Sequence, residues 1–568
     1  MQTPRSGQLP AFSRRHALRA AGIAATAMAT IGFEPGATRA QEATPAAAAL
    51  PDLTGVTPLP LTGEHLATFE SYVAGKVAEL GVPGVAVGVV QDGEVAFLQG
   101  FGVRELGRPE PVTPDTLLRI GSVTKSFSSL LAATLVDTGQ VAWDTPLVDL
   151  LPDFAVEDAE LTPRLTVEDA FCACSGLPRR DLEFIFPAND LTPERMIASM
   201  ATLPLTAPFG EKYQYNNQLV AAGGFAAGVA DGGSAEALGH AYAIALRDRV
   251  LNPIGMPRTT YNLSEVVAGN DYASPHAADL FGEVRPVPLL MDDTWLTPVA
   301  PSGALWSSVR EMVRYVQMEL QHGVAPDGVE VVSPENLERT WQPGVALPHA
   351  PGSPPEMADF AQHYGLGWVV GAYGGQRAIW HSGGTLGFSS LVTFLPEAGL
   401  GAVVLTNGSG AAGQLIYAVT FRLLELLFEQ PATMDALVAA NLAGVASGRA
   451  DLLATIGQID PAVVTPFLGT YANPDLGDLT LTLRGDTLTF ASGPYRSALL
   501  PQMAEDGSVA GYLIVDPPLS GFPPQGVFVL EPGTGGQPRI VLTVPADGGE
   551  PDLVYVYEPL GTTATPTA

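Results

Sequence analysis

A serine and a lysine three residues apart, Ser122 and Lys125, are the two side chains of this sequence best suited to do chemistry together. On a helix, positions i and i+3 lie on one face, so the lysine amine would be in reach of the serine hydroxyl. A serine hydroxyl becomes a nucleophile only when a neighbouring base takes its proton. A lysine can be that base only if its pKa falls from about 10.4 toward neutrality. We therefore predict Ser122 as a nucleophile and Lys125 as its base.

The use of lysine in the whole chain supports this prediction. Lysine occurs only at Lys76, Lys125 and Lys212, although the chain has 28 basic residues. Arginine cannot give up its proton in a protein, so a site that needs a titratable amine must keep a lysine. The apolar, Ser/Ala-rich run at 127–135 predicts that the helix carrying Lys125 is buried.

A second motif, Tyr215-Asn216-Asn217, lies in the middle of the chain. A tyrosine hydroxyl can relay a proton to a leaving group, so we predict Tyr215 as the third catalytic residue. The amide of Asn217 can hold Lys125 and can also hydrogen-bond a substrate amide.

A third motif, His381-Ser382-Gly383-Gly384, ends a predicted strand. We predict that His381 and Gly383 bind substrate, because a glycine lets a ligand approach the strand backbone. The N–H groups of Gly384 and Ser122 would form an oxyanion hole. Gly121 would let the backbone turn into the first helical turn, where free N–H groups favour an anion beside Ser122.

The surrounding pattern predicts an α+β fold, in which helices flank an antiparallel sheet that is built from both ends of residues 62–429. Apolar periodicity predicts a helix over 65–81, and alternating or continuous apolar runs predict a hairpin over 84–98. A long stretch up to about residue 360 is dense in helix signals and predicts an all-helical subdomain. Further strands are expected at 364–368, 377–381, 389–396 and 401–407, followed by a helix at 414–428.

The last quarter of the chain has a different texture. Residues 430–460 are expected to form a helical linker, and 461–560 a small β-barrel, because short strands alternate there with Gly/Pro turns. The strands are expected at 479–483, 488–490, 512–515, 527–530, 540–544 and 553–557. Residues 561–568 are expected to be disordered.

The first 40 residues are typical of a targeting signal. Arg14 and Arg15 precede an apolar run at 20–33, and the sequence Ala-Thr-Arg-Ala ends at Ala40. This pattern predicts a twin-arginine export signal with cleavage after Ala40, and the apolar run is shorter than the about 20 residues of a membrane-spanning helix. We expect residues 41–61 to be a flexible leader. The protein is expected in the periplasm, the cell envelope or the medium.

Composition restricts the possible partners. The net charge of −31 argues against nucleic acid and against an anionic membrane surface. Only Cys172 and Cys174 are present, and we interpret them as small buried residues, with a strained bridge between them as the alternative. No metal site and no cofactor are predicted, and the expected partner is a small molecule or a short peptide. The oligomeric state stays open.

The order S-x-x-K, Y-x-N and H-x-G resembles the serine β-lactamase and penicillin-binding superfamily, in particular its class C β-lactamase and D-alanyl-D-alanine carboxypeptidase branch. The resemblance covers about residues 62–428 and includes supporting phrases at 113–116, 174–178, 253–256, 303–307 and 364–368. It implies that Ser122 is acylated, Lys125 is the base, Tyr215 shuttles protons and Asn217 positions substrate. Residues 467–471 resemble the opening of the lipocalin-like barrel that some of these hydrolases carry.

The chain departs from the family pattern in two places. His381 stands where class C β-lactamases usually carry lysine, and residues 171–174 replace the usual Thr-His-Thr before Ser-Gly-Leu. We therefore expect an exported serine hydrolase that acts on D-amino-acid peptides, amides or short esters. The alternatives are a β-lactamase and a catalytically idle penicillin-binding-like protein. An α/β-hydrolase esterase is disfavoured because no serine lies in a G-x-S-x-G elbow.

Overall fold

The computed structural model describes residues 50–187, 190–349, 353–521, 527–544 and 552–560. The predicted export signal, residues 41–49 of the predicted leader and the predicted disordered tail lie outside these residues. Within the described residues, no helix is both long and apolar enough to cross a membrane.

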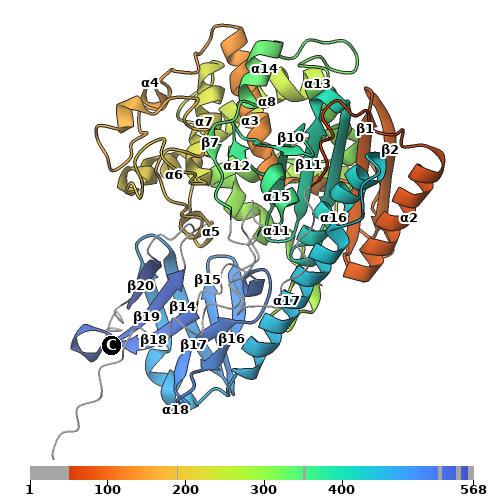
Figure 1. Cartoon of the computed structure of the whole chain (residues 1–568). Helices are drawn as coiled ribbons and strands as arrows, with labels where there is room; N and C mark the ends of the chain where they lie inside the picture. Colours follow the sequence, from red (N-terminus) through yellow and green to blue (C-terminus); the bar gives the residue numbers. More distant parts are fainter. Residues whose placement is uncertain (1–49, 188–189, 350–352, 522–526, 545–551, 561–568) are drawn as a thin grey trace, which may run out of the picture.

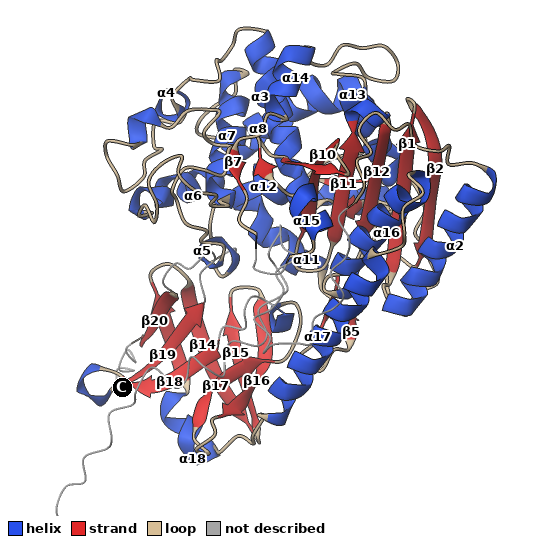
Figure 2. Cartoon of the chain, viewed as in Figure 1, coloured by secondary structure: helices blue, strands red, loops and turns tan. Residues whose placement is uncertain are grey.

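The hydrolase-like part is organised around an eight-stranded antiparallel sheet (Figures 1 and 2). Its strand order is β2-β1-β12-β11-β10-β9-β8-β7, so strands from the beginning and the end of this part lie side by side, as the sequence predicts. The strands are β1 (Gly84–Gln91), β2 (Glu94–Gly102), β7 (Val345–Ala346), β8 (His363–Tyr364), β9 (Val369–Tyr373), β10 (Gln376–Gly384), β11 (Ser389–Leu395) and β12 (Leu400–Thr406).

Both faces of this sheet are covered, which explains why its central strands are almost continuously apolar. Helices α2 (Gly63–Leu80) and α16 (Ala411–Leu427) pack together on one face. Helix α13 (Val309–Leu320) covers the other face, where its Val313 lies against Gly88 of β1. Successive residues of β1 therefore enter two different apolar clusters, as the two-residue period of a strand requires.

A helical region lies beside the sheet and holds the Ser122 motif. The main helices are α3 (Thr124–Asp137), α7 (Asn217–Ala230), α8 (Leu238–Leu246) and α14 (Pro334–Thr340). Helix α3 packs against α7, α8 and α14, and twelve of its fourteen residues are buried. The predicted burial of the Ser122 helix is thus confirmed.

The chain then runs through α17 (Met434–Ala454) into a closed eight-stranded barrel, drawn in blue at the bottom of Figure 1. The barrel strands are β13 (Gly469–Asn473), β14 (Gly477–Arg484), β15 (Thr487–Ser492), β16 (Tyr495–Met503), β17 (Val509–Ile514), β18 (Val527–Pro532), β19 (Pro538–Val544) and β20 (Leu553–Pro559). All six barrel strands expected from the sequence are present, and β13 and β16 are additional. Neither of these two shows a clear alternation in sequence, and β16 contains Pro501.

Two expectations need correction. Residues 50–61 were expected to be flexible, but Leu53 and Leu61 are buried, and the amide of Leu53 donates to the carbonyl of Gly374 at 2.6 Å. The expected strand at 364–368 is in fact the end of β8 followed by a bend. Gly367 has φ +79°, and a side chain there would lie 2.9 Å from the carbonyl oxygen of Lys125, so this bend supports the Ser122 helix.

Candidate active site

Ser122 lies at the turn that leads from β3 (Leu118–Arg119) into α3. Gly121 makes this turn possible because its φ is +53°, a value that residues other than glycine rarely adopt. The hydroxyl of Thr124 donates to the carbonyl of Gly121 at 2.7 Å and closes the turn. The turn is further fixed by Leu305, whose carbonyl accepts a hydrogen bond from the amide of Ile120 at 2.9 Å.

Lys125 is completely buried, and its Nζ lies 3.1 Å from Ser122 Oγ, as the helical spacing predicts. Nζ also lies 2.7 Å from Asn217 Oδ1 and 2.6 Å from the carbonyl oxygen of Ser302. Burial holds the pKa of the Lys125 amine well below its usual value. The carboxylate of Asp181 opposes this shift and the guanidinium of Arg179 adds to it.

The three neighbours of the amine decide what it can do. A neutral amine has two N–H donors and one lone pair. The oxygens of Asn217 and Ser302 can only accept, so they take the two N–H groups. The lone pair is then left for the hydroxyl proton of Ser122, which is the arrangement that a general base requires.

The second motif reaches the site because Asn216 begins helix α7. Its Oδ1 accepts from the amide of Leu219 at 2.7 Å, and its Nδ2 donates to the carbonyl of Pro178 at 2.7 Å. Asn217 therefore sits in the first turn, where its Nδ2 donates to Asp181 Oδ1 at 3.0 Å. The prediction that Asn217 holds Lys125 is confirmed in the structure, whereas its predicted contact with substrate stays a prediction.

Tyr215 lies on the other side of this cap and is buried beside the lysine. The centre of its ring is 4.7 Å from Lys125 Nζ and 5.4 Å from the guanidinium carbon of Arg179. The structure thus brings together Ser122, Lys125, Tyr215 and Asn217 from separate elements.

His381, at the end of β10, is also brought to the site, but its ring is fully buried. Its Nδ1 donates to the carbonyl of Ser382 at 2.6 Å, and its Nε2 lies 3.0 Å from the hydroxyl of Tyr364, which donates to it. Burial above all lowers the pKa of His381 to about 3. The ring of His381 is therefore neutral around pH 7. The predicted direct contact with substrate is not supported, because both ring nitrogens are occupied, and His381 instead supports the wall formed by Tyr364 and Tyr215.

The glycines of the third motif allow close packing between β10 and the turn before Ser122. A side chain at Gly383 would lie 1.9 Å from the carbonyl oxygen of Ile120, and one at Gly121 would lie 2.6 Å from the amide nitrogen of Gly384. The hydroxyl of Ser390 on β11 also donates to the carbonyl of Ile120 at 2.7 Å. Gly383 was predicted to admit substrate to the strand, but the group that fills its space is the turn before Ser122. This packing brings the amide of Gly384 next to that turn, as the predicted oxyanion hole requires.

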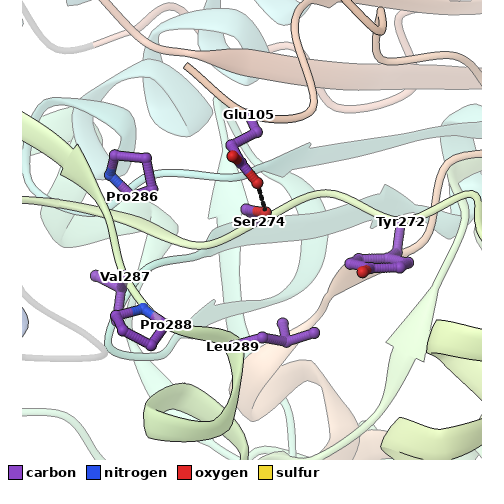
Figure 3. Close-up of a pocket in the computed structure, with 7 residues that line it drawn as sticks. All are labelled: Glu105, Tyr272, Ser274, Pro286, Val287, Pro288 and Leu289. Carbon is purple, nitrogen blue, oxygen red and sulfur yellow. Dashed lines mark hydrogen bonds between the residues drawn. The ribbon is translucent and has the colours of Figure 1, made fainter. Parts of the chain in front are cut away.

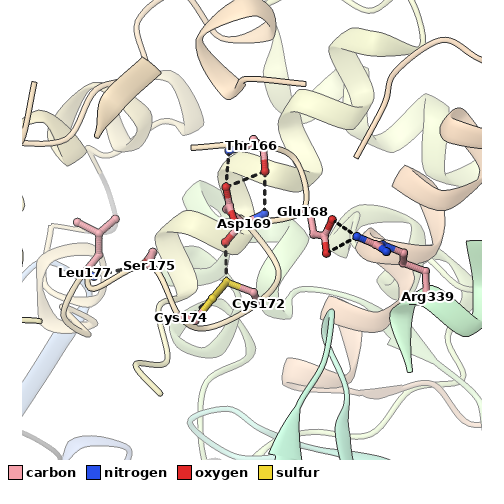
Figure 4. The surroundings of a disulfide bond; sticks show 8 residues. All are labelled: Thr166, Glu168, Asp169, Cys172, Cys174, Ser175, Leu177 and Arg339. Carbon is pink, nitrogen blue, oxygen red and sulfur yellow. Dashed lines mark hydrogen bonds and ion pairs between the residues drawn. A yellow bond between two sulfur atoms is a disulfide. The ribbon is translucent and has the colours of Figure 1, made fainter. Parts of the chain in front are cut away.

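A three-residue loop also supports the Tyr215 segment. Cys172 and Cys174 form a disulfide (Figure 4), so the interpretation that both are simple buried residues is wrong. Ala173 has φ +51°, which folds the loop so that the two Cα atoms are 5.3 Å apart, within bonding range. The carbonyl of Ala173 accepts from the amide of Gln214 at 2.8 Å, directly before Tyr215.

Three groups of the site are not among the residues predicted from the sequence: Arg179, Asp181 and the carbonyl of Ser302. Arg179 pairs with Asp181 at 2.6 Å, and Asp181 holds the amide of Asn217. Their only sequence signal was proximity to the phrases at 174–178 and 303–307. A backbone carbonyl has no signature of its own, so Ser302 could not be found without coordinates.

The model of one protein family, Beta-lactamase, matches residues 69–426. All the site residues described above lie inside this match. The chain belongs to this family. Membership of this family supports a serine hydrolase.

Individual relatives are distant. The chain is 29% identical over 390 residues to penicillin-binding protein 4 of Amycolatopsis lactamdurans, covering 69% of this chain and 93% of that protein. It is 28% identical over 355 residues to the unguisins hydrolase ungD' of Aspergillus campestris, covering 61% of this chain and 62% of that protein. The chain thus spans less than two thirds of the length of this hydrolase.

Among solved structures, the octameric penicillin-binding protein homologue from Pyrococcus abyssi is similar, with a TM-score of 0.56 and 21% identity. The match covers 87% of this chain and 100% of that one. At this identity the similarity shows the fold alone.

Proposed function

We propose that the protein hydrolyses short peptides or amides of D-amino acids, and short esters, through an acyl-enzyme on Ser122. The observation that carries this proposal is the buried Lys125 amine, whose two N–H groups have acceptors and whose third neighbour is Ser122 Oγ. Lys125 takes the proton as Oγ attacks the carbonyl carbon. The amides of Ser122 and Gly384 then stabilise the oxyanion.

In the next step the leaving amine or alcohol needs a proton, and we assign its relay from Lys125 to Tyr215 because the Tyr215 ring lies beside the Lys125 amine. Water then attacks the acyl-enzyme, and the same groups act in the reverse order. Every catalytic group in this scheme belongs to the chain itself.

The preference for peptides and esters over penicillins rests on His381. A lysine at this position would offer a fixed positive charge to the carboxylate of a β-lactam. His381 is neutral and buried, and its pKa of about 3 leaves it without charge at any ordinary pH. Two relatives fit a substrate with a peptide backbone: one is named as a hydrolase of unguisins and the other as a penicillin-binding protein.

The test is a panel of substrates assayed with the full chain: a D-alanyl p-nitroanilide, a short p-nitrophenyl ester and a chromogenic cephalosporin. We expect kcat/KM for the first two to exceed that for the cephalosporin by at least about tenfold. A cephalosporin preferred by that margin over both would make the protein a β-lactamase. Failure to cleave any of the three, without labelling by a fluorophosphonate, would favour the idle binding protein.

We also propose that the chain is exported in folded form through its Arg14-Arg15 signal. The support is the sequence of residues 1–40 and the strongly acidic chain that follows. Replacing both arginines with lysine should retain the protein inside the producing cell, and cell fractionation would show this. Unchanged export of the variant would contradict the proposal.

A further inference from the structure

A cavity of about 360 Å³ is lined by seven residues, none of which belongs to the site described above (Figure 3). Five of its seven lining residues present apolar or aromatic surface, and the other two, Glu105 and Ser274, are joined by a hydrogen bond of 2.6 Å. The apolar part is formed by Tyr272, Pro286, Val287, Pro288 and Leu289. Small-molecule sites commonly combine such walls with a few polar groups that fix the orientation of the ligand.

One wall of the cavity is attached to the segment that leads to Ser122. Tyr272 lies between two residues that hydrogen-bond with Leu117: the amide of Leu117 donates to the carbonyl of Asp271 at 2.9 Å, and the amide of Ala273 donates to the carbonyl of Leu117 at 3.0 Å. This places Tyr272 beside the strand that ends at the nucleophile.

The same segment, beyond Ser274, is attached to the turn that follows Gly384. The amide of His276, two residues after Ser274, donates to the carbonyl of Gly387 at 3.1 Å. A side chain at Gly387 would lie 2.4 Å from Pro275 Cβ, so the two segments are in contact. Three residues of chain span at most about 10 Å, so Gly387, which contacts the residue next to Ser274, lies within that distance of Gly384.

The pairing of β10 gives a direction to a substrate chain. Strand β9 pairs with β10 only from Gln376 to Trp380, whereas β11 pairs with β10 up to Gly384. An extended peptide can therefore add to the β9 side of β10 only after Trp380, and it can continue only past Gly384. If it runs antiparallel to β10, like the other neighbours of this strand, its amino-terminal end points toward the cavity.

The charge of the cavity suits such an end. Hydrogen bonds from Ser274 and Arg108 lower the pKa of Glu105 below its usual range, so this carboxyl is ionised. Arg108 Nε lies 2.6 Å from Glu105 Oε1, but the Arg108 side chain is 67% exposed and can move into solvent when another cation binds. The net charge of −31 also favours the approach of a cation.

We propose that this cavity is a subsite for the apolar amino-terminal residue of a short peptide, whose free ammonium group pairs with the carboxylate of Glu105. The acyl residue next to the scissile bond would occupy the β10 edge, and the residue before it would enter the cavity. This subsite rests on the proposed function, because it assigns a specificity to the same reaction.

The experiment compares two substrates that differ only at the amino end: D-leucyl-D-alanyl p-nitroanilide with a free amine and its N-acetylated form. We expect the full-length wild type to prefer the free amine by about tenfold in kcat/KM, mainly through KM. In Glu105→Gln this preference should fall to within about twofold. Glu283→Gln is the matched control, because Glu283 is 69% exposed on a neighbouring strand connection and does not line the cavity.

A second variant tests the apolar walls. Leu289→Trp should fill the cavity and lower kcat/KM for both dipeptide anilides at least about tenfold. It should leave D-alanyl p-nitroanilide, which has no residue to place there, nearly unchanged. Equal losses on all three substrates, or an unchanged amine preference in Glu105→Gln, would overturn the subsite.

The two proposals fail in different ways. A wild type that cleaves the free and acetylated forms equally well overturns the subsite alone. A wild type that cleaves none of the anilides overturns the proposed function and the subsite with it.

Discussion

At the scale of single residues, the site depends on one amine with three fixed neighbours. The spacing of Ser122 and Lys125 was sufficient to predict their contact because helix geometry alone places them on one face. The orientation of the lone pair was not predictable. It depends on Asn217 and on the carbonyl of Ser302, which are 92 and 177 residues away from Lys125 along the chain.

Lys125→Met keeps the length of the side chain and removes the amine, so we expect kcat to fall by about 10³-fold. Lys125→Arg keeps a charge that cannot be given up and should lose activity to a similar extent. Steady-state kinetics would measure both losses, and circular dichroism would show that the fold is kept. If either variant retained activity within about tenfold of the wild type, Lys125 would not be the base.

A substitution at His381 tests whether this residue is neutral and only supports the Tyr364 and Tyr215 side chains. Because burial lowers its pKa to about 3, His381 should not titrate between pH 5 and 8. His381→Asn should therefore lower kcat/KM without moving the acid limb of its pH profile by more than about 0.3 units. A larger shift of this limb would show that His381 itself is protonated in the working range.

At the scale of elements, the sequence predicts strands best where both faces of the sheet are covered. The central strands of the sheet are covered on both faces, so their apolar runs were clear. The Cys172–Cys174 disulfide could not be chosen over two free thiols, because the loop closes here with Ala173 at φ +51°, a value that residues other than glycine uncommonly adopt. Strand β16 was missed because its outward residues include neither a regular polar alternation nor a clean apolar run.

Helix α13 carries a buried acid that should make stability depend on pH. Glu319 is fully buried, and Trp341 Nε1 donates to its Oε2 at 3.1 Å. Burial raises the pKa of Glu319 to about 8, above the value of about 4.3 in an unfolded chain. Between these values the folded protein holds a proton that the unfolded chain releases. The contribution of this group to stability therefore falls as the pH rises through this window, by roughly 1 kcal/mol per pH unit.

Glu319→Gln should remove this dependence. Thermal unfolding at pH 5.5 and pH 8 should show the variant gaining melting temperature relative to the wild type at the higher pH. Asp137→Asn offers a control, because Asp137 forms exposed hydrogen bonds to Ser333 on a neighbouring segment. An identical pH dependence in wild type and Glu319→Gln would contradict the assignment of a buried proton.

At the scale of the whole molecule, the barrel is attached to the segments that carry the site. Its position relative to the hydrolase part could not be predicted, because the contacts join residues hundreds of positions apart. The ring of Tyr495 lies 6.1 Å from that of Phe186, and the amide of Leu280 donates to the carbonyl of Val515 at 2.9 Å. The buried side chains of the barrel and the helical region form one continuous apolar cluster.

Another contact of the barrel lies close to the residues that position Lys125. The hydroxyl of Tyr555 donates to Glu183 Oε1 at 3.2 Å. Glu183 lies two residues after Asp181, whose carboxylate accepts a hydrogen bond from Asn217. We expect Tyr555→Phe to lower kcat by about two- to fivefold with little change in stability, since only one partly buried hydrogen bond is lost. Thr482→Val, which alters an exposed hydroxyl on the barrel surface, should leave kcat unchanged. Equal kinetics in both variants would show that the barrel does not influence the site through this contact.

The most direct test of the central claim, that Ser122 is a nucleophile activated by Lys125, is covalent labelling of the full chain with a fluorophosphonate, followed by intact mass measurement and peptide mapping. We expect a single adduct, located on Ser122, that forms at least about 100-fold more slowly in Lys125→Met and does not form in Ser122→Ala. An adduct on a different serine, or labelling of Ser122→Ala at the rate of the wild type, would contradict the claim.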